Sequence, residues 1–304
     1  MSVLSRPEFH DEAAAYAYVE ARIWANGRVC PHCGECERTG KLNGASTRIG
    51  AYKCYQCRKA FTVKIGTIFE ASHVPMNLWL QSIYLMCASK KGISSNQLHR
   101  TLGVTLKTAW FMSHRIRHAM SDDGTMQFGN GGGVVEVDET FIGTNSKKSK
   151  TARGYAHKMK VVSLVDRETG RAKSIVVDDL TIATITPILE ANIAKEAVLH
   201  TDEAKHYTKP GKAFAGHGVV QHSVGEYGRG DVHTNTIEGF FSIFKRGMKG
   251  VYQHCGKKHL HRYMAEFDFR YTNRVANGID DQMRAVIALV GVKGKRLTYQ
   301  TTGA

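Results

Sequence analysis

Two pairs of cysteines constrain the fold of the N-terminal part of this chain more than any other feature. They are Cys30-Pro-His-Cys33 and Cys54-Tyr-Gln-Cys57, two C-x2-C turns separated by a short segment. Two thiolates at this spacing chelate one tetrahedral ion from a tight turn, and two such turns complete a closed zinc site. Such a site holds together a segment that is too small to bury its own core. We therefore expect residues 1–70 to form an N-terminal helix and a zinc ribbon with structural Zn²⁺.

Other side chains of this ribbon have the chemistry of ligands or of DNA contacts. His32 and Cys36 are ligand types, but the two C-x2-C pairs already fill a closed tetrahedral site, which favours free surface side chains at both positions. Basic residues interleave with aromatic residues between positions 41 and 64, as in a DNA-contacting zinc ribbon. The same charges also fit a solvated face.

The balance of charge indicates a polyanionic partner. The formal net charge is +15 and the pI is about 9.5, so nucleic acid is the first candidate and an anionic membrane the second. The sequence has no run of 18 apolar residues, and acids at Glu8, Asp11 and Glu12 do not suit a signal peptide. We expect a cytoplasmic, nucleoid-associated protein with no membrane partner. Four of the seven cysteines lie in the close pairs, which in a reducing compartment indicates metal rather than disulfides.

The segment 71–121 has the pattern of a helix-turn-helix unit. A first helix would end near residue 92, a second would be capped by Ser94 or Ser95, and a third would be capped by Thr105 after a turn at Gly103. The start and outer face of the third helix would enter a major groove, although such helical trios also occur as plain structural bundles. The DNA contacts expected on that helix are Lys107 and Arg115.

A strand-like segment, Val-Val-Glu-Val-Asp-Glu-Thr-Phe-Ile-Gly over residues 134–143, follows a glycine-rich linker at 122–133. Successive side chains on a strand point to opposite faces, so we expect only one of Asp138 and Glu139 to look into a site. Asp138 is the functional candidate. A lone carboxylate in an apolar strand is costly unless it is paired or binds a cation. Taken alone, the pattern favours a plain acid on an edge strand.

The pattern downstream predicts an α/β sheet domain. The expected elements are a basic loop at 147–153, strands at 160–166 and 172–178 with a hairpin turn at 168–170, a helix at 185–195, and a strand at 197–201. Asp202 then lies at the carboxyl end of a strand, where open α/β sheets place their sites. Its neighbours Glu203 and His206 are treated as bystanders.

A helix predicted over residues 234–249 carries a third acid. Its apolar stripe consists of Ile237, Phe241, Phe244 and Met248, and a second face presents Glu238, Ser242, Lys245 and Lys249. One carboxylate and two cations therefore share a face. Asn235 followed by Glu238 also has the form of a helix capping box, which requires no catalytic role.

Asp138, Asp202 and Glu238 form one pattern, because gathered carboxylates resist ionising together unless divalent cations occupy the cluster. Two such cations can activate an attacking oxygen and stabilise a leaving oxygen of a phosphodiester. The chain here resembles the bacterial insertion-sequence transposases that join an N-terminal zinc ribbon to a DDE core. The resemblance extends from about residue 10 to 275. It rests on the four cysteines, Val-Glu-Val-Asp-Glu-Thr-Phe-Ile-Gly, His200-Thr-Asp-Glu, and Asn235-Thr-Ile-Glu followed by Lys245.

The resemblance implies an α/β fold with an RNase H-like mixed-sheet core at 130–275, followed by a C-terminal helix and tail at 276–304. It implies that Asp138, Asp202 and Glu238 bind catalytic Mg²⁺ or Mn²⁺ and that the protein cleaves and joins DNA strands. Asn235 is a further possible ligand through its amide oxygen. The DNA contacts implied on the last helix are Lys245 and Lys249.

The partners that follow are double-stranded DNA, as insertion-sequence ends and as target, and further copies of this chain, since two ends to be joined require at least a dimer. A second interpretation is a DNA-binding transcriptional regulator that has the same ribbon and helix-turn-helix but a catalytically inactive α/β domain. Both interpretations predict salt-sensitive DNA binding.

Overall fold

The computed structural model describes residues 2–122, 124, 126–145 and 154–298. Contacts divide the chain into two compact units, one formed by residues 1–120 with 280–304 and the other by residues 121–279. The predicted basic loop at 147–153 lies outside the described residues. Within the described ranges, no helix combines the length and the apolar character that crossing a membrane requires.

The first unit begins with a helix and a small sheet. Helix α1 (Glu12–Ile23) starts at Asp11, whose carboxylate accepts a hydrogen bond from Ala14 N–H at 2.6 Å. A three-stranded antiparallel sheet follows, whose core contains Tyr52 and Phe61 and two of the paired cysteines. The phenol of Tyr52 donates to the carboxylate of Glu20 on α1 at 2.7 Å, which ties the helix to the sheet. The strands are β1 (Thr39–Lys41), β2 (Tyr52–Cys54) and β3 (Ala60–Phe61).

Four further helices complete this unit: α2 (Met76–Ala88), α3 (Ser95–Leu102), α4 (Leu106–Ala119) and α9 (Asp281–Val290). The starts of α3 and α4 follow the expected caps, since Ser94 Oγ accepts from Gln97 N–H and Thr105 Oγ1 accepts from Thr108 N–H, both at 3.2 Å. Gly103 ends α3 with φ of +66°, a left-handed conformation that glycine adopts without a steric cost. Helix α9, which is far from the others in sequence, belongs to the same unit as the N-terminal helices.

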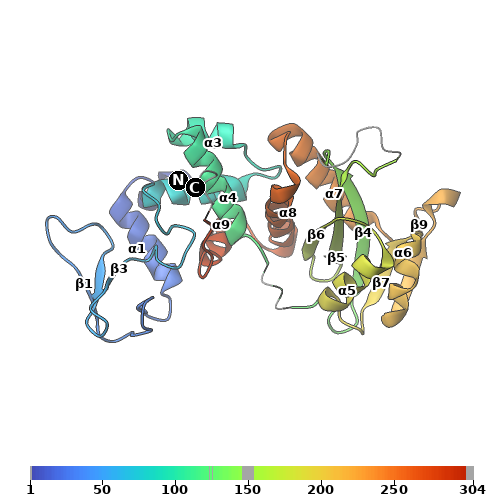
Figure 1. The fold of residues 1–304 in the computed structure, drawn as a ribbon, viewed down its shortest axis with the longest axis horizontal. Coiled ribbons are helices and arrows are strands. Elements are labelled where there is room, and N and C mark those ends of the chain that lie inside the picture. Colours follow the sequence, from blue (N-terminus) through green and yellow to red (C-terminus); the bar gives the residue numbers. More distant parts are fainter. Residues whose placement is uncertain (1, 123, 125, 146–153, 299–304) are drawn as a thin grey trace, which may run out of the picture. The chain divides into compact units, whose positions relative to one another are not determined.

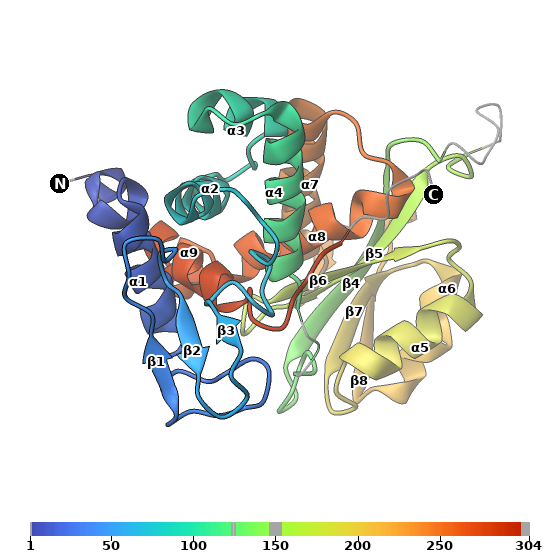
Figure 2. The ribbon, with the colours of Figure 1, turned by 60° about the vertical axis from the view of Figure 1, so that its left-hand side comes forward.

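The second unit contains a five-stranded mixed sheet in the order β6-β5-β4-β7-β8. Figure 1 labels its strands β6, β5, β4 and β7, and Figure 2 labels β8 as well. Strand β4 lies at its centre, antiparallel to β5 and parallel to β7. The α/β fold expected from the sequence, with a mixed-sheet core, is confirmed. Strand β8 has no counterpart among the expected elements. The strands are β4 (Val134–Ile142), β5 (Met159–Asp166), β6 (Ala172–Val177), β7 (Val198–Asp202) and β8 (Gly216–Val220).

Helices cover both faces of this sheet (Figure 2). On one face α7 (Asn235–Gly247) and α8 (Lys257–Thr272) pack against Ile142, Val161 and Val165. On the other face α5 (Ile182–Asn192) and α6 (Lys205–Thr208) pack against Val135 and Val137. Period-two alternation along β4 therefore sends even-numbered residues toward α7 and odd-numbered residues toward α5.

Short elements connect these parts. A two-stranded hairpin of β9 (Gly228–Arg229) and β10 (Val232–His233) directly precedes α7. A π-helical turn, η5 (Met248–Tyr252), follows α7. The 3-10 turns are η1 (Val3–Ser5), η2 (Pro7–Phe9), η3 (Pro210–Ala213), η4 (His222–Val224) and η6 (Val275–Asn277).

Candidate active site and metal centres

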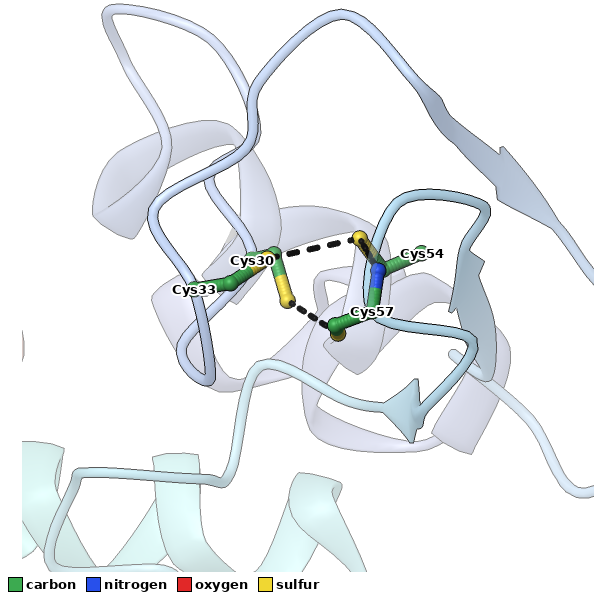
Figure 3. Close-up of side chains that lie close together, drawn as sticks. All are labelled: Cys30, Cys33, Cys54 and Cys57. Atoms are coloured by element: carbon green, nitrogen blue, oxygen red, sulfur yellow. Dashed lines mark hydrogen bonds between the residues drawn. The ribbon is translucent and has the colours of Figure 1, made fainter.

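The four paired cysteines converge in the first unit (Figure 3). The Sγ atoms of Cys30 and Cys57 lie 3.7 Å apart, and those of Cys33 and Cys54 lie 3.6 Å apart. A tetrahedral ion with metal–sulfur bonds of about 2.3 Å has sulfur–sulfur edges of about 3.8 Å. The four thiols, none of which is in a disulfide, therefore fit a closed tetrahedral site of the zinc-ribbon type.

A second cluster of ligand atoms lies in the sheet unit. Carboxylate oxygens of Asp138, Glu139 and Asp202 all lie within 4.8 Å of one another. The expectation that only one of Asp138 and Glu139 can look into a site is therefore wrong. The register between β4 and β7 ends at Glu136, so the side of β4 that faces Asp202 is unpaired beyond that residue. Side chains from both faces of β4 can turn around this unpaired edge.

Asp138 is the acid with the strongest need for a cation. Burial, together with the neighbouring carboxylates of Asp202 and Glu139, raises the pKa of Asp138 to about 8. Its carboxylate accepts a hydrogen bond from Glu139 N–H at 2.7 Å. Among the described residues no lysine or arginine forms an ion pair with it. A divalent ion would supply the charge that these protein groups lack.

Asp202 and Glu139 are held by groups around the end of β7. Asp202 accepts a hydrogen bond from Ala204 N–H at 3.0 Å, and burial raises its pKa. Glu139 accepts from the Tyr207 hydroxyl at 2.8 Å and lies 3.3 Å from Nε2 of His206. Burial alone would raise the pKa of Glu139, but the hydrogen bonds from His206 and Tyr207 lower it. His206, which sequence analysis treated as a bystander, thus contacts the cluster.

Glu238 lies in the first turn of α7 and lines the same cleft as Asp138. Its charge contributes to the raised pKa of Asp138, although Glu238 stands outside the tight cluster of three acids. Its Oε1 accepts from the Thr234 hydroxyl at 3.0 Å and lies 3.5 Å from His222 Nε2. The alternative explanation, a capping box of Asn235 and Glu238, does not hold, because Thr234 is the N-cap and Asn235 is already the first helical residue.

The cleft beside the acids has a volume of about 720 Å³. It carries both signs of charge, since basic side chains from the end of α7 and from η5 line it together with Asp138, Glu139 and Glu238. Lys245 and Lys249, both expected to contact DNA, belong to this lining. Its remaining residues are Phe241, Ser242, Arg246 and Gly250.

The two DNA contacts expected on α4 differ in their surroundings. Lys107 is exposed in the first turn of the helix. Arg115 is only 5% exposed, and its guanidinium donates to the carbonyl oxygens of Ile68 and Glu70 at 2.7 and 2.9 Å. The side chain of Arg115 therefore connects α4 with the segment that precedes α2 and does not extend toward a groove. Sequence periodicity missed this because the carbonyl partners lie more than 40 residues away.

Known proteins match both parts of the chain. Residues 10–60 match the model of a transposase zinc-ribbon domain, and residues 131–272 match that of an ISXO2-like transposase domain. An uncharacterized protein in the transposable element ISH50 of Halobacterium salinarum is 28% identical over 264 residues, covering 81% of this chain and 86% of the relative.

Among solved structures, a chain of a simian T-cell lymphotropic virus intasome in complex with the PP2A regulatory subunit B56 gamma aligns at 12% identity with a TM-score of 0.29. The alignment covers 63% of this chain and 65% of the viral-complex chain, which is less than two thirds of its length.

Proposed function

Because this chain belongs to the insertion-sequence transposases that join a zinc ribbon to an ISXO2-like DDE domain, we propose that it binds its element's ends and performs metal-dependent strand cleavage and strand transfer. The observation that carries this proposal is the convergence of Asp138 and Asp202 at the open edge of β4, with Glu238 lining the same cleft. The buried carboxylate of Asp138 lacks a cationic partner among the described residues.

We assign Asp138, Asp202 and Glu238 as the ligands of Mg²⁺ or Mn²⁺, because carboxylate oxygens suit these hard cations. When bound, such ions favour ionisation of the attacking oxygen and stabilise the leaving oxygen. Lys245 and Lys249 bind phosphates of the strand in the cleft and hold it in line with the carboxylates. Glu139, fixed by Tyr207 and His206, supports the cluster from the opposite face of β4.

The first unit supplies DNA recognition in this proposal. The four cysteines hold a structural Zn²⁺, and α4 presents Lys107 to the major groove. Two ends must be brought together before they are joined, so the active form on DNA contains at least two copies of this chain. The protein acts where the chromosome lies, in the nucleoid.

Replacement of one acid tests this function directly. Asp202→Asn should abolish nicking and strand joining of the element's ends while end binding is retained, because the DNA contacts lie on other residues. Glu203→Gln is the matched control, since the Glu203 carboxylate is engaged by Ser223 N–H and Oγ. If Asp202→Asn cleaves like the parent in Mg²⁺, or if the parent binds its ends and never cleaves them, the DNA-binding regulator becomes the better account.

A further inference from the structure

We propose that the ion pair between the buried Glu136 and the partly buried Arg167 positions Glu238 relative to Asp138, so that Glu136 and Arg167 are positioning residues for the metal site. This inference rests on the proposed function, because it concerns the spacing of two of the assigned ligands.

Glu136 lies two residues before Asp138 on the same face of β4 and is fully buried. Its two carboxylate oxygens have different partners. Oε1 accepts from Arg167 Nε at 2.5 Å, and Oε2 accepts from the backbone N–H of Ile237 at 2.9 Å. Ile237 is the residue before Glu238. One carboxylate thus connects the strand that carries Asp138 with the helical turn that carries Glu238.

The N-terminus of α7 depends on this carboxylate. The first N–H groups of a helix have no intrahelical partner and carry partial positive charge, so an anion there stabilises both the position and the direction of the helix. The N-cap residue Thr234 does not cap the backbone with its side chain, which instead donates to Glu238. Glu136, 101 residues away in sequence, therefore satisfies Ile237 N–H.

Arg167 extends the same connection to the hairpin before α7. Its Nη1 donates to the carbonyl oxygen of Asp231 at 2.7 Å, and its Nη2 donates to that of His233 at 2.6 Å. His233 directly precedes Thr234, which holds the Glu238 carboxylate. The planar guanidinium can make these contacts and the Glu136 contact at once, which a lysine ammonium cannot reproduce.

The two acids on this face of β4 thus have different roles. Glu136 is neutralised inside the protein by Arg167, with Nδ1 of His233 3.4 Å away, so it is not available as a ligand. Asp138 has no such cationic partner among the residues described. Loss of the Glu136–Arg167 pair should allow the start of α7 to move and widen the spread of distances between the Asp138 and Glu238 carboxylates. The consequence is weaker metal binding.

The test uses the full-length protein with two variants. Glu136→Gln keeps the shape of the side chain and an acceptor for Ile237 N–H, but it removes the negative charge that pairs with Arg167. Arg167→Lys keeps the positive charge but removes the planar guanidinium and its several donors. The first readout is the affinity for Mn²⁺ without DNA, measured by the electron paramagnetic resonance of free Mn²⁺. The second is the Mg²⁺ concentration that gives half-maximal cleavage of the element's ends.

Both variants should weaken Mn²⁺ affinity and raise the half-maximal Mg²⁺ concentration by roughly 10- to 100-fold, the range for residues that orient metal ligands. Saturating Mn²⁺ should restore cleavage, and end binding should remain at the parent's affinity. Arg270→Lys is the matched control, because Arg270 forms a buried ion pair with Glu266 within α8 and has no contact with Asp138 or Glu238 among the described residues. It should lower stability and leave both metal readouts unchanged.

Folded Glu136→Gln and Arg167→Lys proteins with the parent's Mn²⁺ affinity and Mg²⁺ dependence would overturn the inference. Shifts of the same size in Arg270→Lys would also overturn it, because a general loss of stability would then explain them. If both variants bind Mn²⁺ more weakly than the parent does, yet the parent never cleaves its element's ends, the proposed function is contradicted. The positioning role is then still supported.

Discussion

At the residue scale, the partners of each acid distinguish their roles. Asp138 lacks a cationic partner among the described residues, Glu136 has Arg167, and Glu139 has Tyr207 with His206. Sequence periodicity placed Asp138 and Glu139 on opposite faces of β4. It could not show that Glu139 also reaches Asp202, because that depends on where pairing between β4 and β7 stops.

A further buried acid, Asp268 on α8, makes folding depend on pH. Its oxygens accept from Ser174 N–H at 2.8 Å and Ser174 Oγ at 2.7 Å. Burial raises the pKa of Asp268 to about 7, even though the hydrogen bonds from Ser174 lower it. Between roughly pH 4 and this value the folded chain keeps a proton that the unfolded chain has released. The stabilising contribution is complete below about pH 4 and is lost as pH rises through 7.

Asp268→Asn should remove this dependence, because an amide stays neutral at every pH. The free energy of unfolding of the parent should fall more steeply between pH 5 and 7 than that of the variant, by at most about 1.4 kcal/mol per pH unit. Urea unfolding at 25 °C over this range measures the difference. Glu190→Gln, which alters an exposed acid of α5, is the control and should keep the parent's slope. Parallel curves for the parent and Asp268→Asn would contradict the assignment.

At the element scale, we expect the fold of the zinc ribbon to depend on a bound metal ion. Replacing Cys54 by Ser should unfold residues 30–61 and weaken end binding, because the sheet of β1, β2 and β3 has only a small core around the cysteines. Elemental analysis should find about one zinc per chain in the parent and much less in the variant. Cys255→Ser, which replaces a thiol of the other unit, should keep the parent's zinc content. A parent purified without zinc, yet folded, would refute this prediction.

Helix α4 allows a separate test of base recognition. Lys107→Ala should reduce discrimination between the specific end and random DNA by roughly 1–3 kcal/mol if the side chain reaches a base edge. Arg100→Ala removes the same charge from an exposed position on α3 and should weaken binding to the specific end and to random DNA equally. Competition binding at fixed salt measures the two affinities. Equal losses on both DNAs for Lys107→Ala would assign Lys107 to the phosphates.

The elements that sequence analysis predicted best are those with local signals. Ser94, Gly103 and Thr105 set the ends of α3 and α4 through bonds to residues at most four positions away. Features that depend on distant partners were missed. Strand β8 contains two glycines in five residues and lacks the apolar alternation of a strand, and α9 joins the N-terminal unit only through tertiary packing. Arg115 was predicted to face DNA because periodicity does not reveal its carbonyl acceptors.

At the scale of the whole molecule, each unit has one cluster of candidate metal ligands within the residues described. The thiolates lie in the unit of residues 1–120 with 280–304, and the carboxylates lie in the unit of residues 121–279. Under the proposed function, this division separates end recognition from phosphoryl transfer within one chain. It explains why the loss of a carboxylate should stop chemistry and spare DNA binding.

The central claim is that Asp138, Asp202 and Glu238 act on the scissile phosphate through a shared divalent ion. The most direct measurement compares cleavage of an element end with that of an end in which sulfur replaces a non-bridging oxygen of that phosphate. Mg²⁺ prefers oxygen ligands and Mn²⁺ accepts sulfur more readily, so sulfur should block cleavage in Mg²⁺, and Mn²⁺ should restore it. Equal inhibition by sulfur in both metals, or cleavage that continues in EDTA, would contradict the claim.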